Sequence, residues 1–165
     1  MKFTAKTVLS LLLVLSFFAF TACTGKPEYK TDVSVADLSA KALAVIEKRD
    51  NLTDASGEFL YFFLSLDENT YSEFSVKTPL GSASIDEFGI FKATSEESAE
   101  DIEAKLTAYL QGRVQSWDTR YDQSEKGKVD GAKVMRFGSY VTYAILSSSE
   151  QEAFFNTVKD ALTQK

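Results

Sequence analysis

The sequence has no histidine and a single cysteine, Cys23, among its 165 residues. Without a second cysteine, no disulfide can form within the chain. Histidine and cysteine supply most of the protein ligands of zinc and other transition metals, so we expect no such metal and no cofactor. Nucleophilic catalysis without a histidine base or a free thiol would have to use a Ser–Lys pair, and no motif marks one.

Basic residues are also few. The chain has 18 Lys and Arg against 24 Asp and Glu, which gives a net charge of −6. Residues 1–22 hold two of the basic residues and no acidic one, so the remaining 143 residues carry −8. An acidic domain is poorly matched to nucleic acid and to anionic lipid headgroups. We therefore expect no nucleic-acid partner.

The N-terminal segment has the organisation of an export signal. Lys2 and Lys6 precede an apolar run over residues 8–20 that only two serines interrupt. This run is too short for a membrane-spanning helix, which needs about 20 residues. A charged segment followed by an apolar run of this length is typical of a signal peptide.

The signal ends at Phe20-Thr21-Ala22-Cys23, which fits a lipobox. Ordinary cleavage after Ala22 would place Phe20 where a small residue is favoured. In a lipoprotein the Cys23 thiol carries a diacylglyceryl group, and two acyl chains hold a protein stably at a membrane. The alternative is a soluble secreted protein with one unpaired cysteine. We predict a signal peptide over 1–22, a lipidated cysteine and tether over 23–33, and one domain over 34–165, anchored in the cell membrane on its extracytoplasmic face.

Hydrophobic periodicity predicts an α+β domain. A capping box at residues 34–37 and apolar spacings of three and four predict a helix over 35–49. The apolar run 59–64 is too short for periodicity to separate helix from strand, and we expect it in the core either way. The later elements are predicted as strand 71–78, strand 82–93, helix 96–122, loop 123–131, strand 132–137, strand 140–147 and helix 149–163. They form two β-β-α units, so we predict a four-stranded antiparallel sheet with an additional N-terminal helix.

The predicted strand 82–93 has apolar residues on both of its faces. Alternation places Ile85 and Phe91 on one face and Phe88 and Ile90 on the other. A sheet of this kind has to be covered on both sides. We expect the helices 96–122 and 149–163 to cover one side. The helix 35–49 and the run 59–64 then cover at least part of the other.

Three stretches of the chain resemble a known family. They are Ile85-Asp-Glu-Phe-Gly-Ile-Phe-Lys-Ala93, the helix with Tyr109-Leu110 and Trp117, and Gly138-Ser-Tyr-Val-Thr-Tyr-Ala-Ile145. Together with the lipobox, the size and the element order, they make the chain similar to uncharacterised, domain-of-unknown-function lipoproteins of Gram-positive, clostridia-like bacteria. The resemblance implies an envelope protein outside the cytoplasm and implies no activity. The one residue role that it carries over is that of Cys23.

The end of the helix 96–122 is a candidate partner-binding surface. Trp117 and Tyr121 follow Arg113 at intervals of four, and Arg120 lies beside them. Tryptophan, tyrosine and arginine dominate the binding energy of protein interfaces. The alternative is that Trp117 and Tyr121 continue the apolar stripe of the helix into the core, which their spacing also fits.

Two groups of carboxylates are candidate acid–base catalysts. Asp86 and Glu87 are neighbours in a predicted strand, so they point to opposite faces and are poorly placed to share a substrate proton. The second group opens the helix 96–122, where the helix dipole favours negative charge. It consists of Glu96, Glu97, Glu100 and Asp101. We interpret this second group as solvated capping charge.

These observations favour a non-enzymatic binding module, anchored by lipid at the cell surface. Besides the membrane, its partner would be an envelope protein, a wall component or a small solute. The alternatives are a hydrolase that acts on envelope material through carboxylates or a Ser–Lys pair, and a structural accessory of a membrane complex. A pocket lined by converging carboxylates would favour the hydrolase, whereas a large exposed apolar patch would favour the binding module.

Overall fold

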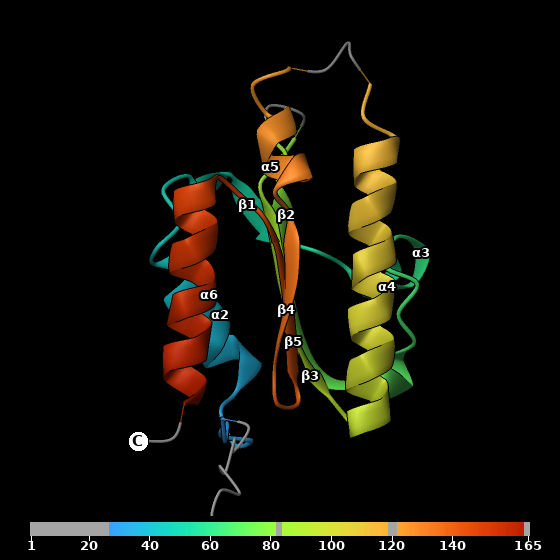
Figure 1. Ribbon diagram of the computed structural model, residues 1–165, viewed down its shortest axis with the longest axis vertical. Helices are drawn as coiled ribbons and strands as arrows, with labels where there is room; N and C mark the ends of the chain where they lie inside the picture. The colour runs from blue at the N-terminus through green and yellow to red at the C-terminus, as the bar shows by residue number, and fades with distance from the viewer. Residues whose placement is uncertain (1–26, 82–83, 119–121, 164–165) are drawn as a thin grey trace, which may run out of the picture.

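The computed structural model describes residues 27–81, 84–118 and 122–163. It has one antiparallel sheet with helices on both faces (Figure 1), so the broad α+β class is confirmed. In chain order the elements are α2 (Val35–Leu43), the 3-10 helix η1 (Arg49–Asn51), β1 (Leu52–Asp54), α3 (Gly57–Phe62), the 3-10 helix η2 (Glu68–Thr70), β2 (Tyr71–Pro79), β3 (Glu87–Ala93), α4 (Glu96–Gln115), α5 (Lys126–Asp130), β4 (Lys133–Phe137), β5 (Tyr140–Ile145) and α6 (Ser148–Leu162). Within the described ranges, no helix has the length and apolar character needed to cross a membrane.

The sheet has five strands in the order β1-β2-β3-β5-β4, and all neighbouring strands are antiparallel. β4 and β5 form a hairpin in which Phe137 lies opposite Tyr140, across Gly138 and Ser139. Gly138 has a φ of +62°, the left-handed conformation that a two-residue hairpin turn needs at its first position. The turn therefore fixes the register of the hairpin.

Each face of the sheet has its own apolar core. Phe88 and Ile90 of β3 pack on one face with α2 and α6. Phe91 of β3 and Tyr143 of β5 pack on the other face with α3, α4 and α5. Figure 1 shows the sheet edge-on, with α2 and α6 on one side and α3 and α4 on the other. The alternation predicted along this strand is confirmed.

The helices are distributed differently from the prediction. We expected α4 and α6 to cover the same side, but they lie on opposite faces. The reason is that α4 covers only the face of the sheet that carries Phe91. The opposite face, which carries Phe88, has to be covered by another helix. α6 covers it, since Phe154 approaches Phe88 with 5.1 Å between ring centroids. α2 lies beside α6, and α3 lies beside α4.

The sheet also has a fifth strand, so the prediction of four strands from two β-β-α units is wrong in number. β1 spans only Leu52–Asp54 and pairs with the end of β2, where Thr53 lies opposite Thr78. Thr53 and Asp54 are exposed. Hydrophobic alternation therefore gives no signal for β1. This strand forms because its backbone pairs with the otherwise unpaired edge of β2.

Two helices end earlier than predicted, and one helix was missed. α2 ends at Leu43 instead of residue 49, and α4 ends at Gln115 instead of residue 122. The short helix α5 lies inside the predicted loop 123–131. Apolar spacing misleads at these ends because residues beyond the helices, such as Ile46 and Trp117, also pack against the core.

Candidate functional site

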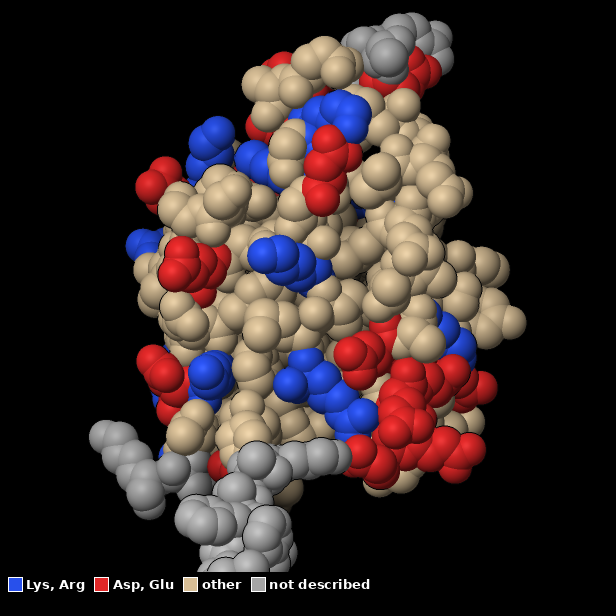
Figure 2. Space-filling model, in the orientation of Figure 1, with Lys and Arg blue, Asp and Glu red and all other residues tan. Residues whose placement is uncertain are grey.

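Three consecutive aromatic side chains on and just after α3 project into solvent. Tyr61, Phe62 and Phe63 are 66%, 72% and 63% exposed, and we call them the aromatic ledge. Leu60 and Leu64 on either side of them are buried. The expectation that the whole run 59–64 belongs to the core is therefore wrong. At the right-hand margin of Figure 2, where Figure 1 places α3, the surface consists largely of uncharged side chains.

α3 is short but firmly held. The Ser56 side chain accepts a hydrogen bond from the backbone N–H of Phe59 and so caps the helix. Leu60 and Leu64 are four residues apart, so they lie on the same side and pack into the core beneath α4. Phe59 stacks on Phe63 with 5.1 Å between ring centroids. The backbone that carries the aromatic ledge is therefore attached to the core.

A hollow of about 450 Å³ lies beside the aromatic ledge, and we call it the acidic hollow. Its lining combines aromatic and acidic side chains, namely Tyr61, Phe62, Tyr71, Glu58, Asp67 and Glu68. No lysine or arginine lines it. The three carboxylates form no ion pair with any residue that the structure describes. Burial raises the pKa of Tyr71, and the negative charges of Glu68 and Asp67 raise it further.

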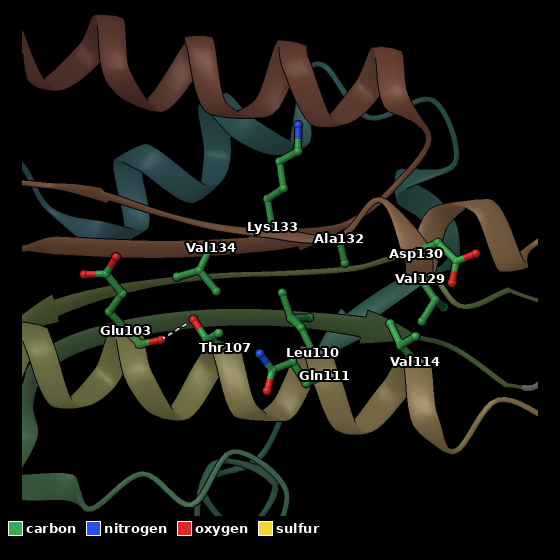
Figure 3. Close-up of a pocket in the computed structure, with 10 residues that line it drawn as sticks. All are labelled: Glu103, Thr107, Leu110, Gln111, Val114, Val129, Asp130, Ala132, Lys133 and Val134. Carbon is green, nitrogen blue, oxygen red and sulfur yellow. Dashed lines mark hydrogen bonds between the residues drawn. The ribbon is translucent and has the colours of Figure 1, made fainter.

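A second hollow, also of about 450 Å³, lies between α4 and the edge strand β4 (Figure 3). Leu110 of α4 points toward the sheet across it, Glu103 lies at one end, and Val114 lies beside Val129 at the other. Lys133 points to the opposite side of the strand, toward α6. We call this space the α4-side hollow. It is lined by apolar side chains at its centre and by polar groups at its margins.

A third hollow, of about 460 Å³, lies on the other face of the same strand. Met135 and Phe137 of β4 line it together with Phe155 of α6. Glu152 and Lys159 of α6 also line it. We call this space the α6-side hollow. The edge of β4 thus runs between two hollows, one on each face of the sheet.

A cluster of polar side chains is buried between α4 and the sheet. Glu87 of β3 is 2% exposed. Tyr143 donates a hydrogen bond of 2.6 Å to Glu87 Oε1, and Tyr109 donates to the same oxygen at 2.9 Å. Arg113 donates to Glu87 Oε2 at 3.1 Å and to the Tyr109 hydroxyl at 2.7 Å. Burial raises the pKa of Glu87, although these three donors hold that pKa down.

The neighbouring carboxylate, Asp86, is also buried and makes different contacts. Lys128 of α5 donates to Asp86 Oδ1 at 2.6 Å and to Glu125 at 3.0 Å. Asp86 and Glu87 therefore face separate partners, and both are enclosed by the protein. Their arrangement ties β3 to α4 and α5, and it leaves neither carboxylate facing a hollow. Within the described residues, no group of acidic or cysteine side chains is placed to hold a metal ion.

The predicted partner-binding stripe falls partly outside the described residues. Because α4 ends at Gln115, Trp117 lies in the following segment and packs, half-buried, against the core beneath α4. Arg120 and Tyr121 lie outside the described residues, as does the lipobox Cys23. Arg113, the first residue of that stripe, donates a hydrogen bond to the buried Glu87.

The carboxylates at the start of α4 behave as capping charge. Glu96 and Glu97 occupy the first turn behind the N-cap Ser95. Arg136 of β4 pairs with Glu96, with 2.5 Å between Nη2 and Oε1. In Figure 2 these acidic side chains gather over the lower end of α4. Sequence reasoning missed the Glu87 cluster, for which the one available signal was a glutamate inside the apolar strand 82–93.

Comparison with known proteins identifies the family. Residues 44–146 match the family described as Domain of unknown function (DUF4358), a segment that begins just after α2 and ends just after β5. It includes the aromatic ledge, the Glu87 cluster and all five strands. Searches of curated proteins and of solved structures gave no significant match. The match covers more than half of the sequence, and the chain therefore belongs to the DUF4358 family of domains of unknown function.

Proposed function

We propose that this protein is a non-enzymatic binding module, anchored by lipid on Cys23 at the extracytoplasmic face of the membrane, and that the aromatic ledge binds its partner. The observation that carries the proposal is the exposure of Tyr61, Phe62 and Phe63. Soluble proteins seldom expose a contiguous apolar patch of this kind unless it is an interaction site. Aromatic side chains also supply much of the binding energy of protein interfaces.

The acidic hollow indicates the chemistry of the partner. Its three carboxylates have no positive partner within the described residues, so they attract a cation. The rings of Tyr61 and Phe62 beside them can bury apolar groups and can also interact with a cation through their faces. A peptide segment in which lysine or arginine stands next to apolar residues satisfies both requirements. We therefore propose that the partner is an envelope protein with such a segment.

The rigidity of α3 supports binding. A surface that is already ordered loses little conformational entropy when a partner covers it. Ser56 caps α3, and Leu60 and Leu64 fix it to the core, so the aromatic ledge is in place before binding. Full burial of one large apolar side chain is worth about 1.5–3 kcal/mol. Three rings thus provide enough energy for a specific contact.

Hydrolysis through the buried carboxylates is the less favoured alternative. Asp86 and Glu87 are 3% and 2% exposed, and both are bonded to neighbours inside the protein. A general acid or base has to come within hydrogen-bond reach of its substrate. Neither carboxylate lines any of the hollows beside α3 or β4. These carboxylates are better explained as part of the packing between the sheet and α4.

The proposed anchor would keep the domain close to the membrane. Tyr29 pairs with Thr163 at the end of α6, and the backbone N–H of Lys30 donates to the Leu162 carbonyl at 2.8 Å. The tether that remains is the segment 23–28, which spans roughly 20 Å when extended. The partner would therefore lie in the layer of the envelope next to the bilayer.

Photo-crosslinking from the ledge tests this proposal. A photoreactive residue at Phe62, in the full chain expressed in its membrane, should crosslink to a discrete partner. The matched control is Leu80, which is 68% exposed at the end of β2. The paired substitution Phe62→Ser and Phe63→Ser should abolish the product, and Glu58→Gln with Glu68→Gln should reduce it several-fold. Equal crosslinking from Phe62 and Leu80, or none from Phe62, would contradict the proposal.

A further inference from the structure

A separate surface, the open edge of β4, carries an inference of its own. β4 stands at the end of the sheet and pairs only with β5. Figure 1 looks along the sheet with β4 in front, and it draws no described helix or strand across this edge. Pro27 and Tyr29 lie beside its last residues, near Arg136 and Gly138. The other edge strand, β1, has three residues, whereas β4 has five. An uncovered strand edge is a template for pairing with another strand.

The hairpin register identifies the backbone groups that are free on this edge. Phe137 and Tyr140 flank a two-residue turn, so they form a hydrogen-bonded pair, and such pairs alternate along the hairpin. The bond from the Ala93 N–H to the Ser139 carbonyl agrees with this alternation, because it directs Ser139 toward β3. The N–H and C=O groups of Val134 and Arg136 therefore point away from β5. They stand ready to pair with an added strand.

We propose that the strand added to β4 is β4 of a second copy of this chain, running antiparallel about a two-fold axis at Met135. In this register Val134 of each copy lies opposite Arg136 of the other. Both residues have outward-facing backbone groups, so two such pairs form four hydrogen bonds. The two five-stranded sheets then become one continuous sheet.

The side chains around the edge are self-complementary in this register. Lys133 lies opposite Phe137 of the second copy, and Met135 lies opposite its own mate, so no like charges face each other across the strands. On α6, Glu152 and Lys159 both line the α6-side hollow. The two-fold axis reverses the direction of α6, so Glu152 of one copy is brought toward Lys159 of the other. This complementarity favours a second copy over an unrelated peptide.

The two hollows provide room for the added strand. Strand addition uses backbone hydrogen bonds for affinity and recesses for alternate side chains for specificity. Arg136 of the second copy lies opposite Val134 and therefore on the face of the α4-side hollow, and its Met135 lies on the face of the α6-side hollow. The aromatic ledge remains accessible. Ala55, just before α3, donates its backbone N–H to the Val76 carbonyl of β2 at 2.9 Å, and β3 and β5 lie between β2 and β4 in the sheet.

Both copies can be anchored in one membrane. A two-fold axis that relates antiparallel edge strands is perpendicular to the sheet, so it turns the same face of both copies to the same side. Tyr29 packs with the core on the face of α2 and α6. Both N-terminal segments therefore leave from one side of the joined sheet.

Disulfide trapping tests the axis directly. In a non-hydrogen-bonded antiparallel pair the two Cα atoms are about 4.5 Å apart, which a disulfide can bridge. Met135→Cys, in full-length protein in membranes, should form a disulfide-linked dimer under mild oxidation. The matched control is Lys133→Cys on the same strand and face, because its Cα should be about 13 Å from its mate. We expect at least a tenfold higher dimer yield for Met135→Cys, and unsubstituted protein gives the background from Cys23.

A second variant separates strand pairing from chance contact. Val134→Pro removes an outward-facing N–H, and proline is tolerated on edge strands. Added to Met135→Cys, it should lower the dimer yield at least tenfold while circular dichroism shows a folded protein. Equal yields from Met135→Cys and Lys133→Cys, no dimer from either, or a yield unaffected by Val134→Pro would overturn the proposal. Failure here leaves the crosslinking from Phe62 unaffected, because the two surfaces are separate.

Discussion

Removing one hydroxyl from the buried polar cluster should measurably weaken the fold. Tyr143 is fully buried on β5, and its hydroxyl donates to Glu87 Oε1 at 2.6 Å. Tyr143→Phe keeps the ring and its packing but takes this donor away. Glu87 Oε1 would then depend on Tyr109 alone, at 2.9 Å. A hydrogen bond to a charged group contributes about 1.5–3 kcal/mol, so we expect a loss of this size in the free energy of unfolding at pH 7.

The free energy of unfolding that Tyr143→Phe removes should become smaller as the pH falls. Burial raises the pKa of Glu87 in the folded protein above the value of about 4.3 for an unperturbed glutamate. The folded state therefore binds this proton more tightly than the unfolded state. The contribution of this tighter proton binding to the free energy of unfolding is fully present below about pH 4.3. It is lost as the pH rises through the pKa of Glu87 in the folded protein. The hydrogen bond from Tyr143 lowers the pKa of Glu87 in the folded protein. Tyr143→Phe therefore raises that pKa further, and the variant loses more of its free energy of unfolding at neutral pH than at low pH.

Urea unfolding at pH 7 and at pH 4, for wild type and variant, measures both effects. Tyr140→Phe is the matched control, since Tyr140 is also fully buried on β5 and donates at 2.5 Å to the uncharged carbonyl of Val33. We expect it to cost about 0.5–1.5 kcal/mol at both pH values. The reasoning fails if Tyr143→Phe costs under about 0.5 kcal/mol at pH 7, or if its cost is the same at pH 4.

Three further outcomes are expected. Leu106→Ala, at a fully buried position on α4, should destabilise the protein by about 2–5 kcal/mol in urea unfolding, and a much smaller value would mean that another face of α4 packs on the sheet. Gly89→Ala should cost about 1–3 kcal/mol, because the added Cβ would overlap the ring of Tyr143, and an unchanged unfolding midpoint would contradict this close approach. Cys23→Ala should remain unprocessed and lose its acyl label in cells fed a labelled fatty acid, whereas equal labelling of both proteins would end the lipoprotein hypothesis.

Much of the layered architecture can be predicted from a few residues of one strand. Phe88 and Ile90 alternate with Gly89 and Phe91, and this pattern correctly indicates a sheet buried on both faces. Which helix covers which face cannot be predicted in this way, because both helices follow hairpins and both have apolar stripes. That choice depends on contacts between distant parts of the chain, such as Phe88 with Phe154.

The candidate site is less predictable than the fold. Hydrophobicity gives Leu60 and Phe62 the same expectation of burial, yet one is buried and the other is 72% exposed. An apolar binding surface and a core have the same composition, and only tertiary packing separates them. The Glu87 cluster was missed because its members come from β3, α4 and β5, and no spacing along the sequence relates them. The prediction that α4 runs on past Trp117 was wrong because a periodic pattern does not show where a helix ends.

The way α3 is attached also bears on how such a protein can change over generations. Leu60 and Leu64 fix the helix to the core, whereas Tyr61, Phe62 and Phe63 are all more than half exposed. Substitutions at exposed positions usually change stability by no more than about 0.5 kcal/mol. Descendants of this chain can therefore acquire a new binding preference at the three outer positions without endangering the scaffold. The same separation makes these positions suitable for a randomised library in which nearly every member still folds.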